Sequence, residues 1–399
     1  MTAPLRLAEV VRSLVAGDAS PLEVLERCLA RLPAAQAHGA FVVVDEEGAR
    51  RAAAALPAQP RGPLHGVPVA VKDLIDVAGL PTALGRSRGR VAARDATIVA
   101  RLRAAGAIVL GKTRTDELGL GALTPGATHP RDASRSPGGS SGGSAIAVAT
   151  GAAPLALATD TAGSARIPAA ACGVTGLCAA PGWMPADGVS VLAPTFDRLG
   201  LIAAAPTDIA VAWTALGGVV GPPPDRIFTL AGEALGRVDP ERSDAAGEAA
   251  RRLTARPVEL PGPSLADFGA LRAVVVTAEA AARHTAAETD AVKAQLAAGA
   301  AHSEAEVRTA RERLDELGAA LREAVGEGVL VTPTLPSAPP RWDELPDVDA
   351  QLRATGWLTR LCGPVNSAGL VALAIPGGVQ VVARATATAL AAALRLESS

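Results

Sequence analysis

The sequence predicts an α/β protein with a mixed, twisted central sheet that is covered by helices on both faces. Short apolar runs typical of strands, including residues 41–44, 67–71, 155–159 and 379–383, alternate with segments of helical periodicity. Strands that alternate with helices along most of a chain indicate an α/β sheet. The chain has 399 residues, of which 49% are hydrophobic, so it can bury a large core.

The N-terminal half contains several helix and strand signals. Residues 5–32 predict two amphipathic helices separated at 17–21, where polar residues and a proline can begin the second helix. Residues 97–105 predict a helix that leads into a strand at 107–110, and residues 201–217 predict a strand and then a helix.

The C-terminal half predicts a strand at 271–277 (LRAVVVT), followed by two or three long helices over 278–326 with a break near Gly299. A further strand is expected at 328–332, and a final helix at 385–396.

Composition and charge exclude several classes of function. The formal net charge is −2 and no basic patch is evident, which argues against nucleic-acid binding. No apolar run reaches membrane-spanning length and the N-terminus lacks a signal-peptide core, so we expect a cytoplasmic protein. Cys28, Cys172, Cys178 and Cys362 are scattered, as are five histidines, so neither a disulfide framework nor a histidine metal site is expected.

Two dense Gly/Ser clusters stand out in the chain, GGSSGG at 138–143 and TAGS at 161–164. Glycine is favoured where the backbone needs a positive φ or approaches a ligand closely. A predicted helix and strand separate the clusters, and this single crossover could bring Ser140 and Ser164 side by side.

Lysine is rare, since Lys72, Lys112 and Lys293 are the only three in the chain. Arginine cannot release its proton in a protein, whereas a buried lysine can. Lys72 ends the predicted strand 67–71, where partial desolvation would favour the neutral amine. The pattern alone also allows a structural role, in which Lys72 reaches solvent or pairs with Asp73.

Residues 106–113 match the phosphate-binding pattern G-x-x-x-x-G-K-[ST], but we reject a nucleotide site there. That motif needs a loop between its glycines, and the intervening Ala-Ile-Val-Leu is typical of a strand interior.

Three motifs, GPLHGVPVAVKD (62–73), PGGSSGGSA (137–145) and ATDTAGSARIPAAACGVTGL (158–177), together resemble the amidase signature family of serine hydrolases. The resemblance extends from about residue 5 to residue 383. It implies the amidase signature fold and a single amidase domain over 1–399. Its regions would be N-terminal helices (5–32), a catalytic core (62–218), a helical substrate-side region (225–326) and C-terminal strands with a helix (327–399).

The resemblance assigns the catalytic lysine to Lys72, the bridging serine to Ser140 and the nucleophile to Ser164, with Ser141 as a supporting donor. It also implies a cis peptide bond between Gly139 and Ser140. The chemistry agrees, because a serine hydroxyl needs a base and no histidine lies near either cluster. A neutral lysine can act as that base through a second hydroxyl, provided that its pKa is lowered by roughly 3 units.

The backbone N–H groups of Thr161, Ala162, Gly163 and Ser164 would then form the oxyanion hole. Asp160 and Arg166 flank this loop, and we expect them to hold its shape rather than to react.

The implied activity is hydrolysis of a small carboxamide to carboxylate and ammonia through a Ser164 acyl-enzyme, without a cofactor or metal and with a possible homodimer. Three alternatives remain open: an allophanate or biuret hydrolase, a glutaminase-type amidotransferase subunit, and a non-catalytic descendant that binds a ligand.

The chain departs from the family pattern at Ala162, where a glycine is frequent, and at Cys178, where a lysine is common. The T-A-G-S form resembles the allophanate hydrolase branch. The segments 113–136 and 374–382 look short, which bears on the shape of the substrate pocket. The aromatic residues available to line that pocket are Trp183, Phe196, Trp342 and Trp357.

Overall fold

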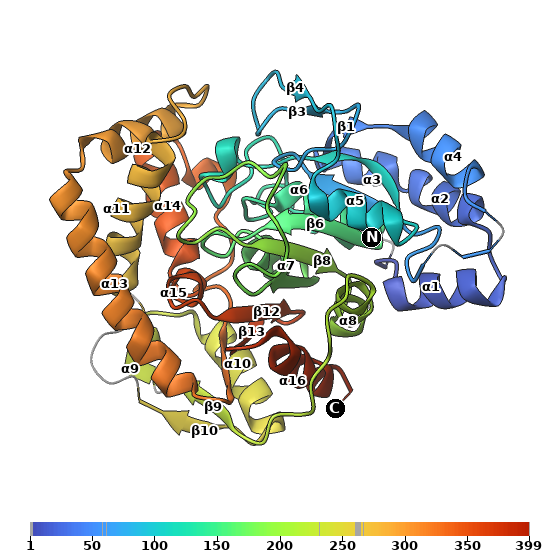
Figure 1. The fold of residues 1–399 in the computed structure, drawn as a ribbon. Coiled ribbons are helices and arrows are strands. Elements are labelled where there is room, and N and C mark those ends of the chain that lie inside the picture. The colour runs from blue at the N-terminus through green and yellow to red at the C-terminus, as the bar shows by residue number, and fades with distance from the viewer. Residues whose placement is uncertain are drawn as a thin grey trace.

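One large sheet runs through the centre of the molecule and helices surround it (Figure 1). The structure, a computed structural model, describes residues 3–57, 59–60, 62–230, 232–259, 265 and 267–398.

The strands of the described chain form the central sheet, apart from a small hairpin of two strands. In chain order they are β1 (Phe41–Val44), β2 (Pro68–Lys72), β3 (Pro81–Thr82), β4 (Arg90–Val91), β5 (Ile108–Thr113), β6 (Leu155–Thr159), β7 (Thr175–Cys178), β8 (Leu199–Ala203), β9 (Ile227–Leu230), β10 (Arg256–Val258), β11 (Val329–Pro333), β12 (Val371–Ile375) and β13 (Val379–Ala383).

The helices connect these strands and cover the sheet. In chain order they are α1 (Leu7–Ala16), α2 (Pro21–Leu29), α3 (Leu32–Ala37), α4 (Glu46–Ala54), α5 (Thr97–Ala104), the 3₁₀ turn η1 (Glu117–Gly119), α6 (Gly142–Ala149), α7 (Arg166–Cys172), α8 (Pro206–Ala215), α9 (Gly232–Leu235), α10 (Pro240–Arg252), α11 (Asp267–Ala281), α12 (Asp290–Ala301), α13 (Glu304–Val325), the 3₁₀ turn η2 (Trp342–Glu344), α14 (Val348–Thr359), α15 (Gly363–Ser367) and α16 (Thr386–Ser398).

The central sheet is mixed, as the sequence predicts. Within the described residues its eleven strands follow the order β1-β5-β2-β6-β8-β7-β12-β13-β11-β9-β10. Strand β2 is parallel to both β5 and β6, whereas β6, β8, β7, β12, β13 and β11 pair in antiparallel fashion. The parallel part holds the predicted catalytic lysine, since Lys72 is the last residue of β2.

Apolar side chains cover both faces of the sheet, because successive residues of a strand point to opposite sides. Val69 and Val71 of β2 pack in one core with α1, α5, α8, α10 and α16. Ala70, between them, belongs to a second core with α2, α3, α4, α6 and α7. Helices α11–α13 form a layer at one end of the molecule, opposite the N-terminal helices (Figure 1).

The carboxyl ends of β2, β5 and β6 lie at one edge of the sheet, because these strands are parallel. Lys72, Thr113 and Thr159 are the last residues of the three strands, and all are buried. In open α/β sheets, this edge is where ligands generally bind.

The predicted strand at 271–277 is wrong, because these residues lie within helix α11. Phe268, Arg272, Val275 and Glu279 are buried at helical spacing, against α12 and α13. A short apolar run rich in β-branched residues cannot be assigned from periodicity alone, and here tertiary packing overrides strand propensity.

Other boundaries also differ from the predictions. The predicted helix break near Gly299 falls instead at His302, where α12 ends, and Ser303 caps α13. Gly299 lies inside α12, where a Cβ would be 2.0 Å from the carbonyl oxygen of Thr277, so it permits close packing against α11. The predicted strand at 107–110 extends to Thr113, so the rejected phosphate-binding motif indeed lies in a strand.

Candidate active site

Lys72 is fully buried and its ammonium nitrogen contacts two hydroxyl groups. Nζ lies 2.7 Å from Oγ of Ser140 and 2.8 Å from Oγ1 of Thr159. Neither contact considered for a structural Lys72 is present: the side chain does not reach solvent, and Asp73 pairs with Lys112 instead.

Burial lowers the pKa of Lys72 to about 7, because removing the ammonium from water penalises the charged form. The negative charges of Asp116, Asp160 and Asp197 oppose this shift without forming a hydrogen bond to Nζ. At neutral pH a substantial fraction of the amine is therefore unprotonated and carries a free lone pair.

Ser140 follows the cis peptide bond that the family resemblance implies, between Gly139 and Ser140. Ser141 supports residues 161–164, which carry the predicted nucleophile and are here called the nucleophile loop. Its N–H donates to the carbonyl oxygen of Ser164 at 3.0 Å, and its hydroxyl donates to the carbonyl oxygen of Thr159 at 3.3 Å. The structure thus brings the two Gly/Ser clusters together through their backbones. Among the described residues, no hydrogen bond joins the hydroxyls of Ser140 and Ser164 directly.

Asp160 organises the nucleophile loop. Its carboxylate accepts hydrogen bonds from the backbone N–H groups of Gly163, Ala165 and Arg166, and from the Arg166 guanidinium at 2.9 and 3.0 Å. Burial alone would raise the pKa of Asp160, but the Arg166 charge and these hydrogen bonds outweigh it and lower the pKa to about 2. These contacts agree with the expectation that Asp160 and Arg166 hold the shape of the loop.

Arg166 anchors the loop to the C-terminal part of the chain. Its guanidinium donates to Gln380 Oε1 at 2.9 Å, to Asn366 Oδ1 at 2.6 Å and to the Cys362 carbonyl at 3.1 Å. Sequence analysis missed Asn366 and Gln380. Their signal is weak, because a polar residue in an apolar helix or strand reveals no partner until the fold is known.

The expected oxyanion donors are in two different states. The N–H of Gly163 donates to Asp160 Oδ1 at 2.8 Å and is therefore occupied. In the described part of the chain, the N–H groups of Thr161, Ala162 and Ser164 have no acceptor. The Thr161 hydroxyl donates to Asp197 Oδ1 at 2.7 Å, which fixes this end of the loop.

Asp116 supports the loop that carries Ser140. It is buried, and its carboxylate accepts hydrogen bonds from the backbone N–H of Leu123 at 3.3 Å and of Thr124 at 2.8 Å. The Thr124 hydroxyl in turn donates to the Gly138 carbonyl at 2.9 Å. Burial raises the pKa of Asp116, although these hydrogen bonds oppose the shift. Sequence analysis missed Asp116, Thr159 and Asp197, because nothing in their spacing marks them.

Cys178, which stands where the family pattern has a lysine, is buried in β7. Its sulfur accepts from Asn366 Nδ2 at 3.6 Å, and burial raises the pKa of its thiol. Cys178 is therefore an unreactive packing residue.

A cavity of about 420 Å³ adjoins the site. Its lining includes Thr159, Thr161 and Gly119 on the catalytic side, and Trp183 and Asp197 on the loop between β7 and β8. Of the four aromatic candidates, Trp183 lines this cavity, Phe196 is buried in the core and Trp342 lines a different cavity. Trp357 lies on α14, where its indole N–H donates to Ser337 Oγ at 2.9 Å.

The arrangement can therefore move a proton from one hydroxyl to a buried amine beside a loop with unoccupied N–H donors. Such a site suits addition of a serine oxygen to a carbonyl and stabilisation of the oxyanion that results.

Comparison with known proteins identifies the family. A family model described as Amidase matches residues 23–220. A crystal structure titled as that of an amidase has 32% sequence identity, covers 99% of each chain and has a TM-score of 0.87. The chain belongs to the amidase signature family.

Two curated relatives of this amidase signature chain each match about half of it. A glutamyl-tRNA(Gln) amidotransferase subunit from Rhodopirellula baltica is 42% identical over 53% of this chain and 45% of its own length. An amidase from Pseudomonas putida is 41% identical over 54% of this chain and 47% of its own length. The matched part thus spans less than half the length of these relatives.

The family membership agrees with the mixed sheet and with the order of the three motifs along the chain. In the described residues, no helix combines the length and the apolar character needed to cross a membrane.

Proposed function

We propose that this protein is an amidase that hydrolyses a carboxamide to a carboxylate and ammonia. Ser164 is the nucleophile, Ser140 is the bridging hydroxyl and Lys72 is the base. The observation that carries the proposal is the fully buried Lys72 amine, 2.7 Å from Ser140 Oγ, with its pKa lowered to about 7 by burial.

In the acylation step, Ser164 Oγ attacks the amide carbonyl carbon and gives its proton to Ser140, which passes its own proton to the neutral amine of Lys72. The free N–H groups of the 161–164 loop receive the developing oxyanion. The proton returns through Ser140 to the amide nitrogen, so that ammonia leaves and the acyl group stays on Ser164. Water then repeats the sequence and releases the carboxylate.

A separation of roles supports this assignment. The buried ion pair of Asp160 and Arg166 holds the loop, and each guanidinium nitrogen of Arg166 donates a hydrogen bond, whereas the Lys72 amine has only hydroxyl partners among the described residues. A lysine without a carboxylate partner gains little from remaining charged.

An amidotransferase subunit is the second candidate. It is favoured by the relative from Rhodopirellula baltica, whose name describes such a subunit. In that case the same Ser164 chemistry would release ammonia from glutamine for use elsewhere.

Fluorophosphonate labelling combined with an ammonia-release assay tests the proposal. We expect the wild-type protein to be labelled and to release ammonia from small amides, and Ser164→Ala to do neither. A wild-type protein that is folded but neither labels nor hydrolyses any amide would support the non-catalytic alternative, a ligand-binding descendant.

We also propose that residues 1–399 act as one amidase domain with the four regions given above, that the protein works in the cytoplasm, and that it forms a homodimer. Size-exclusion chromatography with light scattering tests the oligomeric state.

A further inference from the structure

The cavity beside the catalytic loop has walls made mostly of hydrocarbon. They include Leu118, Met184, Val189, Leu192 and Leu199, together with the ring of Trp183. We propose that this cavity binds an uncharged, apolar group carried by the amide, of about the size of a phenyl ring with a short chain. This inference names the substrate class of the proposed amidase and therefore rests on that function.

The cavity is placed to hold the part of a substrate next to its reacting carbon. Thr159, which contacts Lys72, and Thr161, at the start of the nucleophile loop, both line it. Gly119 lines it as well, and a Cβ on this glycine would lie 3.6 Å from Ser140 Oγ. A group in the cavity would thus lie beside the residues that contact Lys72 and Ser140, on the side from which the amide carbonyl would reach Ser164.

Among the described residues that line the cavity, two side chains are charged, those of Asp197 and Arg198, and each is hydrogen-bonded to the protein. The Asp197 carboxylate accepts from the Thr161 hydroxyl and from the backbone N–H groups of Leu192 and Ala193. The Arg198 guanidinium donates from Nη1 to the Asp197 carbonyl at 2.8 Å, and its buried Nε has no partner among the described residues.

These contacts disfavour a substrate that carries an ammonium. An amino-acid amide such as glutamine would bring an ammonium and a carboxylate into an apolar space. The Asp197 carboxylate already accepts hydrogen bonds from Thr161, Leu192 and Ala193, so an ammonium finds no free carboxylate among the described lining residues. The Arg198 guanidinium donates one hydrogen bond within the described chain, so its remaining N–H groups can pair a carboxylate but not an ammonium. Removing an ammonium from water without a partner strongly opposes binding. An apolar group instead gains from leaving water, and a free N–H of Arg198 can donate to one neutral acceptor.

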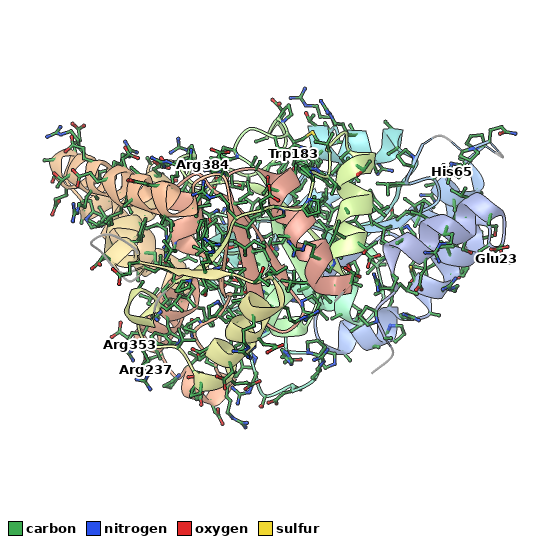
Figure 2. The ribbon with its side chains drawn as sticks, turned by 90° about the horizontal axis from the view of Figure 1, so that it is seen from below. Glu23, His65, Trp183, Arg237, Arg353 and Arg384 are labelled. Carbon is green, nitrogen blue, oxygen red and sulfur yellow. The ribbon has the colours of Figure 1, made fainter. Side chains whose placement is uncertain are left out.

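Trp183 makes one wall of the cavity rigid. Its ring stacks on Trp213 of α8 with a centroid distance of 4.4 Å, and the Trp213 indole N–H donates to the Val219 carbonyl at 2.9 Å. Figure 2 shows Trp183 beside this helix. An aromatic wall held in this way favours a flat apolar group over a flexible polar one.

A substrate series tests the inference through the kcat/KM for ammonia release. We expect phenylacetamide to exceed acetamide by about a hundredfold or more, since each buried methylene adds about fourfold. Glutamine, whose ammonium would lack a partner in the cavity, should fall below phenylacetamide by a similar factor. A preference for glutamine, or for the anionic amide malonamate, over phenylacetamide would overturn the inference while leaving the amidase proposal intact.

Two valine variants sharpen this test. Val191 lines the cavity and is 38% exposed, whereas Val42 on β1 is 40% exposed and lies outside the cavity. Val191→Asp should lower kcat/KM for phenylacetamide about tenfold or more relative to acetamide, whereas Val42→Asp should leave the ratio unchanged. Equal ratios in both variants would contradict the inference.

Direct binding separates failure of the pocket from failure of the chemistry. Phenylacetamide should bind to Ser164→Ala and quench tryptophan fluorescence, and Trp183→Leu should remove the quenching. Binding of phenylacetamide without turnover of any amide by the wild-type protein would contradict the amidase proposal but support the apolar pocket. Turnover of acetamide with no measurable binding of phenylacetamide would support the amidase proposal but contradict the apolar pocket.

Discussion

Lys72 and Lys112 lie on neighbouring parallel strands and are both fully buried, yet their surroundings differ. Lys112 is paired in register with Val71, the residue before Lys72. Its ammonium contacts the Asp73 carboxylate at 3.1 Å, the Thr82 hydroxyl at 2.9 Å and the Pro81 carbonyl at 3.1 Å. Lys72 has two hydroxyl partners and no carboxylate within hydrogen-bonding distance among the described residues.

The difference shows that burial alone does not make a lysine suited to accept a proton, because the partner of the buried amine also matters. Burial lowers the pKa of both lysines, but at Lys112 the charge and the hydrogen bond of Asp73 oppose the shift. A carboxylate partner keeps Lys112 as half of an ion pair, which suits a structural role. Two hydroxyl partners leave Lys72 with a pKa of about 7, which suits proton transfer at neutral pH.

The largest expected effect comes from replacing the base. Lys72→Arg should reduce kcat/KM for any amide substrate by at least about a thousandfold, because a guanidinium stays protonated and cannot accept the serine proton. Ammonia release measures the loss, and circular dichroism checks that the variant is folded. Substantial activity in a folded Lys72→Arg variant would contradict the assignment.

Removing the bridging hydroxyl should have the next largest effect. Ser140→Ala should lower kcat by several orders of magnitude with little change in stability, because the route from Ser164 to Lys72 loses its relay. Ser141→Ala is the matched control. This variant keeps the backbone N–H that donates to the Ser164 carbonyl, so its decrease in kcat should be much smaller. Comparable losses in both variants would argue against a relay through Ser140.

Replacing Lys112 should lower stability more than replacing Lys72, although Lys72 is the residue expected to matter for activity. Lys112→Met leaves the Asp73 carboxylate buried without its cation, so the free energy of unfolding should fall by about 3–5 kcal/mol. Lys72→Met removes a buried amine that has no carboxylate partner, so its cost should be within about 1.5 kcal/mol. Urea denaturation measures the free energy of unfolding of both variants. An equal or larger decrease for Lys72→Met would contradict the proposed difference between the two lysines.

The pH dependence of activity reports the state of Lys72 directly. Because the neutral amine is the active form, kcat/KM should fall about tenfold per pH unit below the pKa of about 7 and level off above it. The profile is measured with an amide that does not itself titrate in this range. A flat profile between about pH 5 and 8 would exclude a titrating base of this kind.

The smallest expected effect is a shift of that profile. Thr159→Val removes a hydroxyl that accepts from Nζ of Lys72. Losing this acceptor further disfavours the protonated amine, so the limb of the profile should move to lower pH while kcat above pH 8 changes less than about tenfold. A shift to higher pH would show that the Thr159 hydroxyl does not stabilise the charged form.

Local patterns predicted much of the fold, with the largest error in helix α11. The strands at 41–44, 155–159 and 379–383 have the predicted bounds. The predicted break at 17–21 separates helix α1, which ends at Ala16, from helix α2, which begins at Pro21. By contrast, residues 271–277 have strand-like composition and become helical because they pack against α12 and α13. Propensity is a weak preference that packing between distant segments can reverse.

Some residues of the candidate site could be found from the sequence, and others only from the structure. The motifs around Lys72, Ser140 and Ser164 are contiguous in the sequence, so their resemblance to the family could be seen without a structure. Thr159, Asp116, Asn366 and Gln380 contribute single polar atoms from separate elements, and only the folded chain shows what they contact.

The amino-acid sequence by itself determined the family, the three side chains proposed to react and the alternation of strands and helices, because each depends on residues that are close along the chain. The tertiary structure decided which buried lysine lacks a carboxylate partner and which walls enclose the cavity beside the site. Both depend on the distances between groups far apart in sequence, and the strength of an electrostatic or apolar contact follows from those distances.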